Sequence, residues 1–304
     1  MRTGWKSWLA AGVLAGAATW LWQRGRERAQ ARKQAPPVDP LATRYGPWAL
    51  VTGAARAEGI GFGFARRLAG KGINVVLVDI LEEELAARAQ ELADKYLVKV
   101  RTAALDLGEP DFLDRLRAET GDLDVGLVVC NHMVTPPDTP AILDMDLATH
   151  HRMIDVNARA YTTLIHAYGR QLVARGRGGL IIVSSGAGLQ ATPYTGAYSA
   201  NKAFQLKLGE ALWYELQGTG VDVLVVAPGL TNTQGEALSG YPQFMVMDVN
   251  SLVVESLDAL GKTPLLIPGR INKAFMAAQT RLMGHRQSLE FMGDFMARGL
   301  GKEQ

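Results

Sequence analysis

The stretch VTGAARAEGIGFG, residues 51–63, contains four glycines and overlaps the end of an apolar run, WALVT, at 48–52. An amphipathic pattern, FARRLAGKG, follows it at 64–72. Glycine adopts backbone conformations that other residues avoid, so such a cluster allows a sharp turn at the end of a strand. The stretch therefore predicts a strand, a tight glycine-rich turn and a helix.

The alternation of apolar runs and helical patterns continues along the chain. It predicts strands at 48–52, 74–79, 98–105, 124–131, 179–185 and 221–228, and a candidate last strand at 264–268. Helices are predicted near 60–71, 81–96, 110–119 and 197–217, with a long helical region that ends near 175. Strands that are apolar throughout and separated by helices indicate a parallel sheet covered on both faces. With right-handed crossovers this gives one doubly wound α/β domain, over residues 47–270.

Composition excludes several classes of function. The net charge of +2 over 304 residues gives no reason to expect a nucleic-acid partner. The single cysteine, Cys130, cannot form a disulfide within the chain, which suits a reducing compartment. No CxxC, HExxH or GxSxG pattern occurs, which argues against a metal site and a serine hydrolase.

In a doubly wound sheet the first strand-to-helix turn binds a nucleotide pyrophosphate, because its glycines allow close approach and the helix N-terminus offers free N–H groups. Gly53, Gly59, Ile60 and Gly61 occupy this turn. A carboxylate is expected about 20 residues later to hold the ribose, and Asp79 fits that position. Asp79 could equally cap the helix at 81–95, and the two roles are compatible. Its charge would repel a 2′-phosphate, so we predict NAD(H) over NADP(H).

A second cluster, SSGAGLQATPYTGAYSANK, spans residues 184–202. Tyr198 and Lys202 are four residues apart and share one face of a helix. A neighbouring ammonium lowers the pKa of a phenol, which can then exchange a proton with a carbonyl or an alcohol. Ser185 follows an apolar strand and could hold the same substrate oxygen. Most Tyr/Lys pairs at this spacing are surface pairs, but here a nucleotide loop and a strand-end serine accompany it.

The chain resembles the short-chain dehydrogenase/reductase family over roughly residues 46–235. The resemblance lies in three features: TG…GIG, the Ser185/Tyr198/Lys202 set and PGLTNT at 228–233. More narrowly, the chain is similar to the membrane-associated 17β-hydroxysteroid dehydrogenase and very-long-chain 3-oxoacyl-CoA reductase branch. The similar stretches are RYGPWALVTGA, GINVVLVD, SSGAG and an N-terminal apolar run. The resemblance implies a Rossmann fold and a homo-oligomer.

The resemblance also implies a role for each matching residue. Tyr198 would be the general acid/base, Lys202 would lower its pKa and bind the nicotinamide ribose, and Ser185 would orient the substrate. Asn157, in DVNARAY, would hold a proton-relay water. Further cofactor contacts are implied for Asp106 and Leu107 near the adenine, Asn131 along the cofactor, and Pro228, Gly229 and Thr233 around the nicotinamide.

Three departures from the family pattern affect the interpretation. The glycine-rich loop is two residues longer than usual, and CNHM at 130–133 places His132 and Met133 where small residues are usual. Asp79 replaces the basic or small residue expected of NADPH-using reductases in this branch, which favours NAD-linked alcohol oxidation. The alternatives are a 3-oxoacyl thioester reductase and a catalytically silent NAD-binding membrane scaffold.

The N-terminus carries a separate signal. Residues 8–22, WLAAGVLAGAATWLW, are apolar, have tryptophans at both ends, and precede a basic cluster; residues 1–33 carry a net charge of +6. We interpret 1–33 as a membrane anchor that spans or half-inserts, with the catalytic domain on the cytoplasmic side. A cleaved signal peptide and a helix packed on the domain are the alternatives. Residues 34–46 are interpreted as a proline-stiffened linker.

The C-terminal third predicts the substrate class. The loop within 230–256 is rich in Leu, Tyr, Phe and Met, and would close over a lipophilic substrate such as a steroid, a retinoid, a long-chain alcohol or an acyl thioester. The helical tail at 271–304 carries Phe275, Phe291 and Phe295. It could lie on a membrane, cap the substrate or form a dimer contact.

Overall fold

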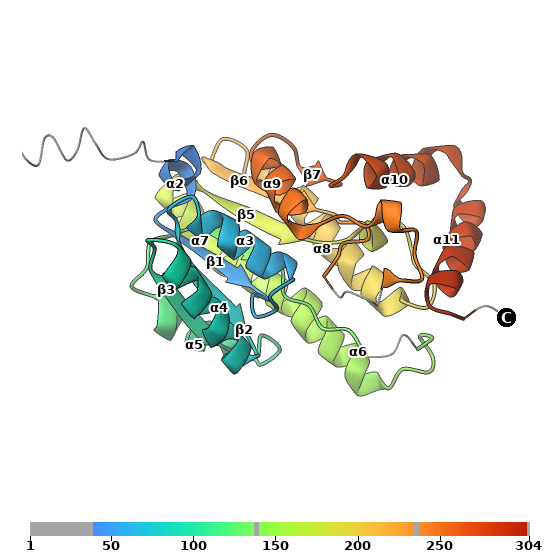
Figure 1. Ribbon diagram of the computed structural model, residues 1–304, viewed down its shortest axis with the longest axis horizontal. Coiled ribbons are helices and arrows are strands. Elements are labelled where there is room, and N and C mark those ends of the chain that lie inside the picture. Colours follow the sequence, from blue (N-terminus) through green and yellow to red (C-terminus); the bar gives the residue numbers. More distant parts are fainter. Residues whose placement is uncertain (1–38, 137–139, 234–237, 303–304) are drawn as a thin grey trace, which may run out of the picture. The chain divides into compact units, whose positions relative to one another are not determined.

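The computed structural model describes residues 39–136, 140–233 and 238–302. Seven parallel strands form one sheet in the order β3-β2-β1-β4-β5-β6-β7 (Figure 1). Their bounds are β1 Trp48–Thr52, β2 Asn74–Asp79, β3 Val100–Ala104, β4 Val125–Cys130, β5 Gly178–Val183, β6 Val221–Val226 and β7 Leu265–Leu266. The order reverses between β1 and β4, so the prediction of a doubly wound parallel sheet is confirmed.

Helices connect the strands and cover the sheet. They are α2 Pro40–Tyr45, α3 Ile60–Ala69, α4 Glu82–Lys95, α5 Phe112–Thr120, α6 Leu147–Ile154, α7 Ala160–Arg175, α8 Gly196–Glu215, α9 Val249–Ala259, α10 Arg270–Leu282 and α11 His285–Gly299. A π-helical turn, η1 (Asp155–Arg159), joins α6 to α7, and 3₁₀ turns lie at η2 (Gly186–Gly188) and η4 (Gln243–Met245).

Two hydrophobic cores lie on opposite faces of the sheet. Successive side chains of a strand point to opposite faces, and in β2 Leu77 packs with α3, α4 and α9 while Val76 packs with α5 and α7. Both side chains are fully buried. Gly63 lets α3 approach α9 closely, because a Cβ at this position would overlap the Val249 side chain.

Some boundaries differ from the predicted ones. Within the predicted linker, Pro40–Tyr45 form α2, because Asp39 accepts a hydrogen bond from the Leu41 N–H (2.9 Å) at its start. The Tyr45 hydroxyl donates to Asp222 (2.7 Å) and ties this helix to the domain. The candidate last strand shortens to two residues, and η1 interrupts the predicted long helix.

The predicted membrane anchor at 1–33 lies outside the described residues. Among the residues that the structure does describe, no helix is both long enough and apolar enough to cross a bilayer.

Candidate active site

The glycine-rich loop turns at the carboxyl end of β1. Gly53 has a φ of +66°, and its N–H donates to the Val78 carbonyl (2.8 Å). A Cβ on Gly61 would overlap the Gly53 carbonyl and lie 2.7 Å from the Asn131 Nδ2. The helix α3 starts at Ile60, and its N-cap, Gly59, provides no side-chain cap. The N–H groups of the first turn are therefore available to an anion.

Asp79 ties this loop to the end of β2. Its carboxylate accepts hydrogen bonds from the N–H groups of Ala55 (3.0 Å), Ile80 (2.8 Å) and Leu81 (3.3 Å). The N-cap of α4 is Leu81, without a side-chain bond, so Asp79 is not the helix cap. The carboxylate lines a cavity and still has acceptor capacity for ribose hydroxyls.

That cavity, of about 430 Å³, brings together most of the residues predicted to bind the cofactor. It is lined by Gly53, Gly59, Ile60, Asp79, Asp106, Leu107, Asn131 and Thr233, and also by His132 and Met133. We name it the cofactor cavity.

Two arginines on the cofactor cavity were missed by the sequence reasoning. Arg152 Nη2 donates to the Asp106 carboxylate (2.6 Å), so Asp106 is part of an ion pair. Arg56 belongs to the glycine-rich loop, is exposed and lines the same cavity. The sequence signal for Arg56 was its place within the glycine-rich loop. Arg152 had no such signal, because only the fold brings it to Asp106.

The unusual residues after β4 pack partly into the core. Asn131 Nδ2 donates to the carbonyls of Thr52 and Gly53 (3.2 Å each) and fixes the loop. The His132 ring packs against Tyr161 at a tilt of 34°, with 4.3 Å between centroids, and its Nδ1 lies 2.8 Å from Thr52 Oγ1. Burial, together with the charge of Lys202, lowers the pKa of His132 to about 3. The imidazole is thus neutral near neutral pH.

Ser185, Tyr198 and Lys202 meet at a second cavity, as predicted. Ser185 precedes η2, and its side chain lies close enough to the Tyr198 hydroxyl to affect the pKa of Tyr198. Lys202 lies one turn further along α8, with its Nζ 5.7 Å from the Tyr198 ring centroid. All three side chains line the cavity, so the arrangement can hold a substrate oxygen and exchange its proton.

The pKa of Tyr198 is shifted in the direction opposite to the predicted one. Burial raises the pKa of Tyr198, and the Ser185 side chain lowers it to a lesser extent. Burial also lowers the pKa of Lys202 to about 7. The predicted net lowering of the Tyr198 pKa is therefore wrong, because burial of the phenol outweighs any stabilisation of its ionised form by Lys202.

Asn157 lies in η1 and holds the segment after β4. Its Oδ1 accepts from the Val134 N–H and its Nδ2 donates to the Val134 carbonyl, both at 2.8 Å. Its own carbonyl accepts from Gln205 Nε2 (2.8 Å). Sequence reasoning missed Gln205, although a polar residue three positions after Lys202 lies on the same helix face. The proton-relay water implied for Asn157 stays a prediction.

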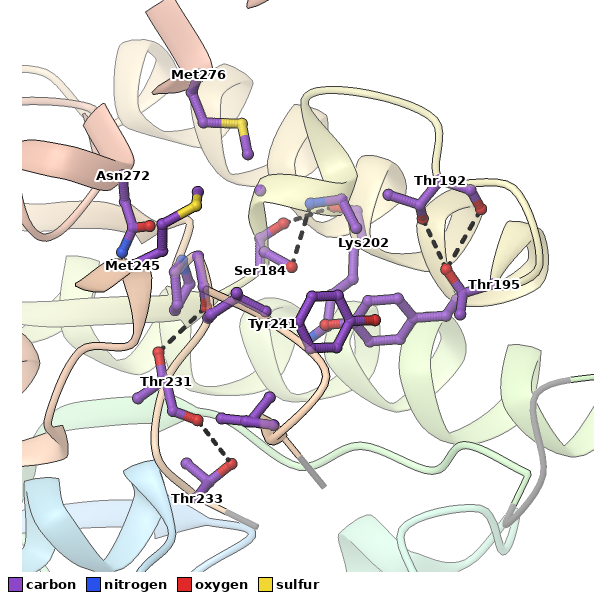
Figure 2. Close-up of a pocket in the computed structure, with 18 of the residues that line it drawn as sticks. Ser184, Thr192, Thr195, Lys202, Thr231, Thr233, Tyr241, Met245, Asn272 and Met276 are labelled. Carbon is purple, nitrogen blue, oxygen red and sulfur yellow. Dashed lines mark hydrogen bonds between the residues drawn. The ribbon is translucent and has the colours of Figure 1, made fainter. Parts of the chain in front are cut away.

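The second cavity, of about 330 Å³, is mostly apolar away from Tyr198. We name it the substrate cavity. Pro228, Gly229 and Thr233 line it near the cofactor cavity, with which it shares Ile60, Asn131, Met133 and Thr233. Figure 2 shows it between Lys202 and Ser184 on one side and Met245, Asn272 and Met276 on another.

The C-terminal helices cover the substrate cavity. Phe275 and Met276 of α10 and Met292, Phe295 and Met296 of α11 line it. Phe275, Phe291 and Phe295 form a ring cluster with centroids 5.8–6.4 Å apart. Of the three alternatives for the tail, this geometry favours a substrate cap.

Comparisons with known proteins agree with this arrangement. A family model described as short chain dehydrogenase matches residues 47–240. A 7β-hydroxysteroid dehydrogenase of Collinsella aerofaciens is 34% identical over 265 residues, which cover 84% of this chain and 98% of the relative. A very-long-chain 3-oxoacyl-CoA reductase of Meyerozyma guilliermondii is 31% identical over 267 residues, which cover 83% of this chain and 69% of the relative.

A solved structure from work on 7β-hydroxysteroid dehydrogenase stereoselectivity matches with a TM-score of 0.78 and 32% identity, over 83% of this chain and 98% of that one. The predicted family is thus confirmed. The narrower predicted branch is not separated from other hydroxysteroid dehydrogenases, because relatives of both kinds match at similar identity.

Proposed function

The chain belongs to the short-chain dehydrogenase/reductase family and is an NAD(P)-dependent oxidoreductase acting on CH–OH groups, and we propose that it interconverts a lipophilic alcohol of steroid size and its ketone with NAD(H). The observation that carries this proposal is the apolar substrate cavity, which opens directly on Ser185 and Tyr198.

The cavity's chemistry supports an uncharged substrate. Among its described lining residues, Lys202 is the only charged side chain, and its Nζ already bonds within the protein. A charged group placed away from Lys202 in this cavity would lose its hydration without gaining a partner. A volume of about 330 Å³ lies within the range of small-molecule sites. The 7β-hydroxysteroid dehydrogenase relatives are named for a hydroxysteroid, which is a lipophilic alcohol.

The alternative 3-oxoacyl thioester is less well supported by this cavity. Its carrier would bring phosphates, which need cationic partners. Met276, Phe295 and Met296 occupy the C-terminal wall instead.

The residues of the cofactor cavity fit a dinucleotide. The first turn of α3 would hold the pyrophosphate, Asp79 the adenosine ribose and Lys202 the nicotinamide ribose. Pro228, Gly229 and Thr233 would border the ring, at the junction of the two cavities. Bound there, the nicotinamide supplies a site that accepts or donates hydride.

Tyr198 and Ser185 handle the proton in this proposal. During oxidation Tyr198 would accept the proton of the substrate hydroxyl, and the nicotinamide, when bound, would supply the hydride acceptor for the carbinol carbon. During reduction Tyr198 returns the proton to the carbonyl oxygen. Ser185 donates to that oxygen and sets its position beside the phenol.

NAD(H) preference rests on Asp79, which lines the ribose end of the cofactor cavity. A carboxylate repels a 2′-phosphate, but Arg56 lines the same cavity and could attract one. Competitive titration with NADH and NADPH, followed by nicotinamide fluorescence, shows which of the two cofactors binds more tightly. Tighter binding of NADPH than of NADH would refute the preference.

A substrate panel tests the substrate class. It contains hydroxysteroids and oxosteroids, retinol, a long-chain alcohol, a 3-oxoacyl-CoA and short-chain alcohols. Each buried methylene contributes about 0.8 kcal/mol, so kcat/KM for a polycyclic alcohol should exceed that for a short alcohol by at least about 100-fold. A highest kcat/KM for short alcohols or for the thioester would refute the proposal.

A pair of phenylalanine variants tests the cavity wall. Phe295 lines the substrate cavity, whereas Phe291 joins the same ring cluster without lining it. Phe295→Ala should raise KM for the lipophilic substrate about ten-fold, since a buried aromatic contact is lost. Phe291→Ala should leave KM within about two-fold. Equal effects of the two variants would place the substrate elsewhere.

The N-terminal anchor and the oligomer are further parts of the proposal. The apolar run at 8–22 and its basic flank support membrane association, with the catalytic domain on the cytoplasmic side. Recovery of the full chain in a high-speed supernatant without detergent would contradict it. A homo-oligomer is implied by family resemblance, and light scattering of the detergent-solubilised chain measures it directly.

A further inference from the structure

Gln205 connects two parts of the active site through its side-chain amide. Its Oε1 accepts from Lys202 Nζ (3.0 Å), and its Nε2 donates to the Asn157 carbonyl (2.8 Å). The side chain is fully buried in α8. A buried amide costs free energy unless both ends are bonded, and here both are.

Lys202 depends on few acceptors. An ammonium has three donors, and Lys202 Nζ gives one to the Val183 carbonyl (2.9 Å) and one to Gln205. The side chain is 3% exposed, so water is not a substitute for either acceptor. The third donor remains for the side of the site where Tyr198 lies.

The titratable groups around Lys202 carry no negative charge near neutral pH. They are His132 and Cys130 at the end of β4, Tyr161 on α7 and Tyr198 on α8. Burial lowers the pKa of His132 and raises the pKa values of the other three. The Gln205 oxygen is therefore one of two neutral acceptors that stabilise the ammonium.

We propose that Gln205 is a positioning residue for catalysis: its amide holds the Lys202 ammonium beside Tyr198 and anchors it to the backbone of η1. The simpler interpretation is a hydrogen bond that only joins α8 to η1. The two interpretations predict different effects on the pKa of Lys202 when the amide is removed. The inference rests on the family activity and not on the identity of the substrate.

The first test needs neither cofactor nor substrate. The Lys202 signal of full-length protein carrying ¹³C-labelled lysine is assigned by its loss in Lys202→Met, and is titrated by NMR. In Gln205→Met the ammonium loses an acceptor in a nearly unchanged volume. The pKa of Lys202, about 7 with Gln205, should fall by about one unit or more. Gln205→Leu provides a second variant without the amide, with the same expected shift.

Gln217→Met is the matched control, because that amide bonds only the Trp213 carbonyl, at the exposed end of α8. An unmoved Lys202 titration in the folded Gln205 variants would overturn the proposal, even if their Tm falls. A second readout is the pH profile of kcat/KM for alcohol oxidation. With less ammonium beside it, Tyr198 ionises less readily, so the acid limb should move to higher pH in Gln205→Met. An unmoved limb would also overturn the proposal.

Discussion

Replacing Tyr198 by phenylalanine removes one hydroxyl and leaves the rest of the site in place. That hydroxyl lies near Ser185, and the ring centroid lies 5.7 Å from Lys202 Nζ. Lys202 is held by Val183 and Gln205, so it cannot reach the substrate oxygen in place of the phenol. Positioned acid–base groups contribute about 10²–10⁴ in rate. We expect kcat to fall by that factor, or about 3–5 kcal/mol in barrier height.

The assay is steady-state turnover of the best alcohol from the substrate panel, together with NADH titration of the same preparations. Cofactor affinity should stay within about two-fold, because the phenol is not needed to hold the nucleotide. Tyr194→Phe is the control, since Tyr194 lies four residues earlier and is not among the residues that line the substrate cavity. A Tyr198→Phe enzyme that keeps more than about a tenth of the wild-type kcat would refute the assignment.

Three further changes have defined outcomes. Asp79→Asn should weaken NADH binding about ten-fold and reduce discrimination against NADPH, because one acceptor becomes a donor; fluorescence titration measures both. Gly61→Ala should destabilise the fold by about 1–3 kcal/mol, since its Cβ would overlap the Gly53 carbonyl, and cofactor binding should fall with it. The pKa of His132 is lowered to about 3, so only the unfolded chain takes up its proton below pH 6.5. The free energy of unfolding should therefore fall by about 2 kcal/mol from pH 7 to pH 5. Urea titrations should show that His132→Asn removes this loss. His285→Asn, at an exposed position, should leave the loss unchanged.

Much of the fold could be predicted because the signals are local. The apolar runs and the glycine turn are short stretches whose patterns determine strand, turn and helix without reference to the rest of the chain. Ser185, Tyr198 and Lys202 lie within 18 residues, so the fold only had to bring this cluster to the cofactor loop. Asp79 was found for the same reason, at the end of the second strand.

The parts that sequence reasoning missed depend on contacts between distant segments. Arg152 meets Asp106 across 46 positions, and Gln205 meets Asn157 across 48. The direction of the Tyr198 shift was wrong because burial is a property of the packed structure. No spacing of Tyr and Lys reports how much water either group loses.

The position of α10 and α11 at the end of the chain has a consequence for how this enzyme could change its chemistry. The glycine-rich loop and Asp79, which line one part of the cofactor cavity, lie within residues 48–131, whereas the aromatic wall of the substrate cavity comes from α10 and α11. The aromatic wall proposed to select the substrate, and Arg56 and Asp79, proposed to select the cofactor, thus lie in separate stretches of the sequence. A chimera that takes its last helices from a relative would acquire a new binding preference while keeping its inherited redox partner.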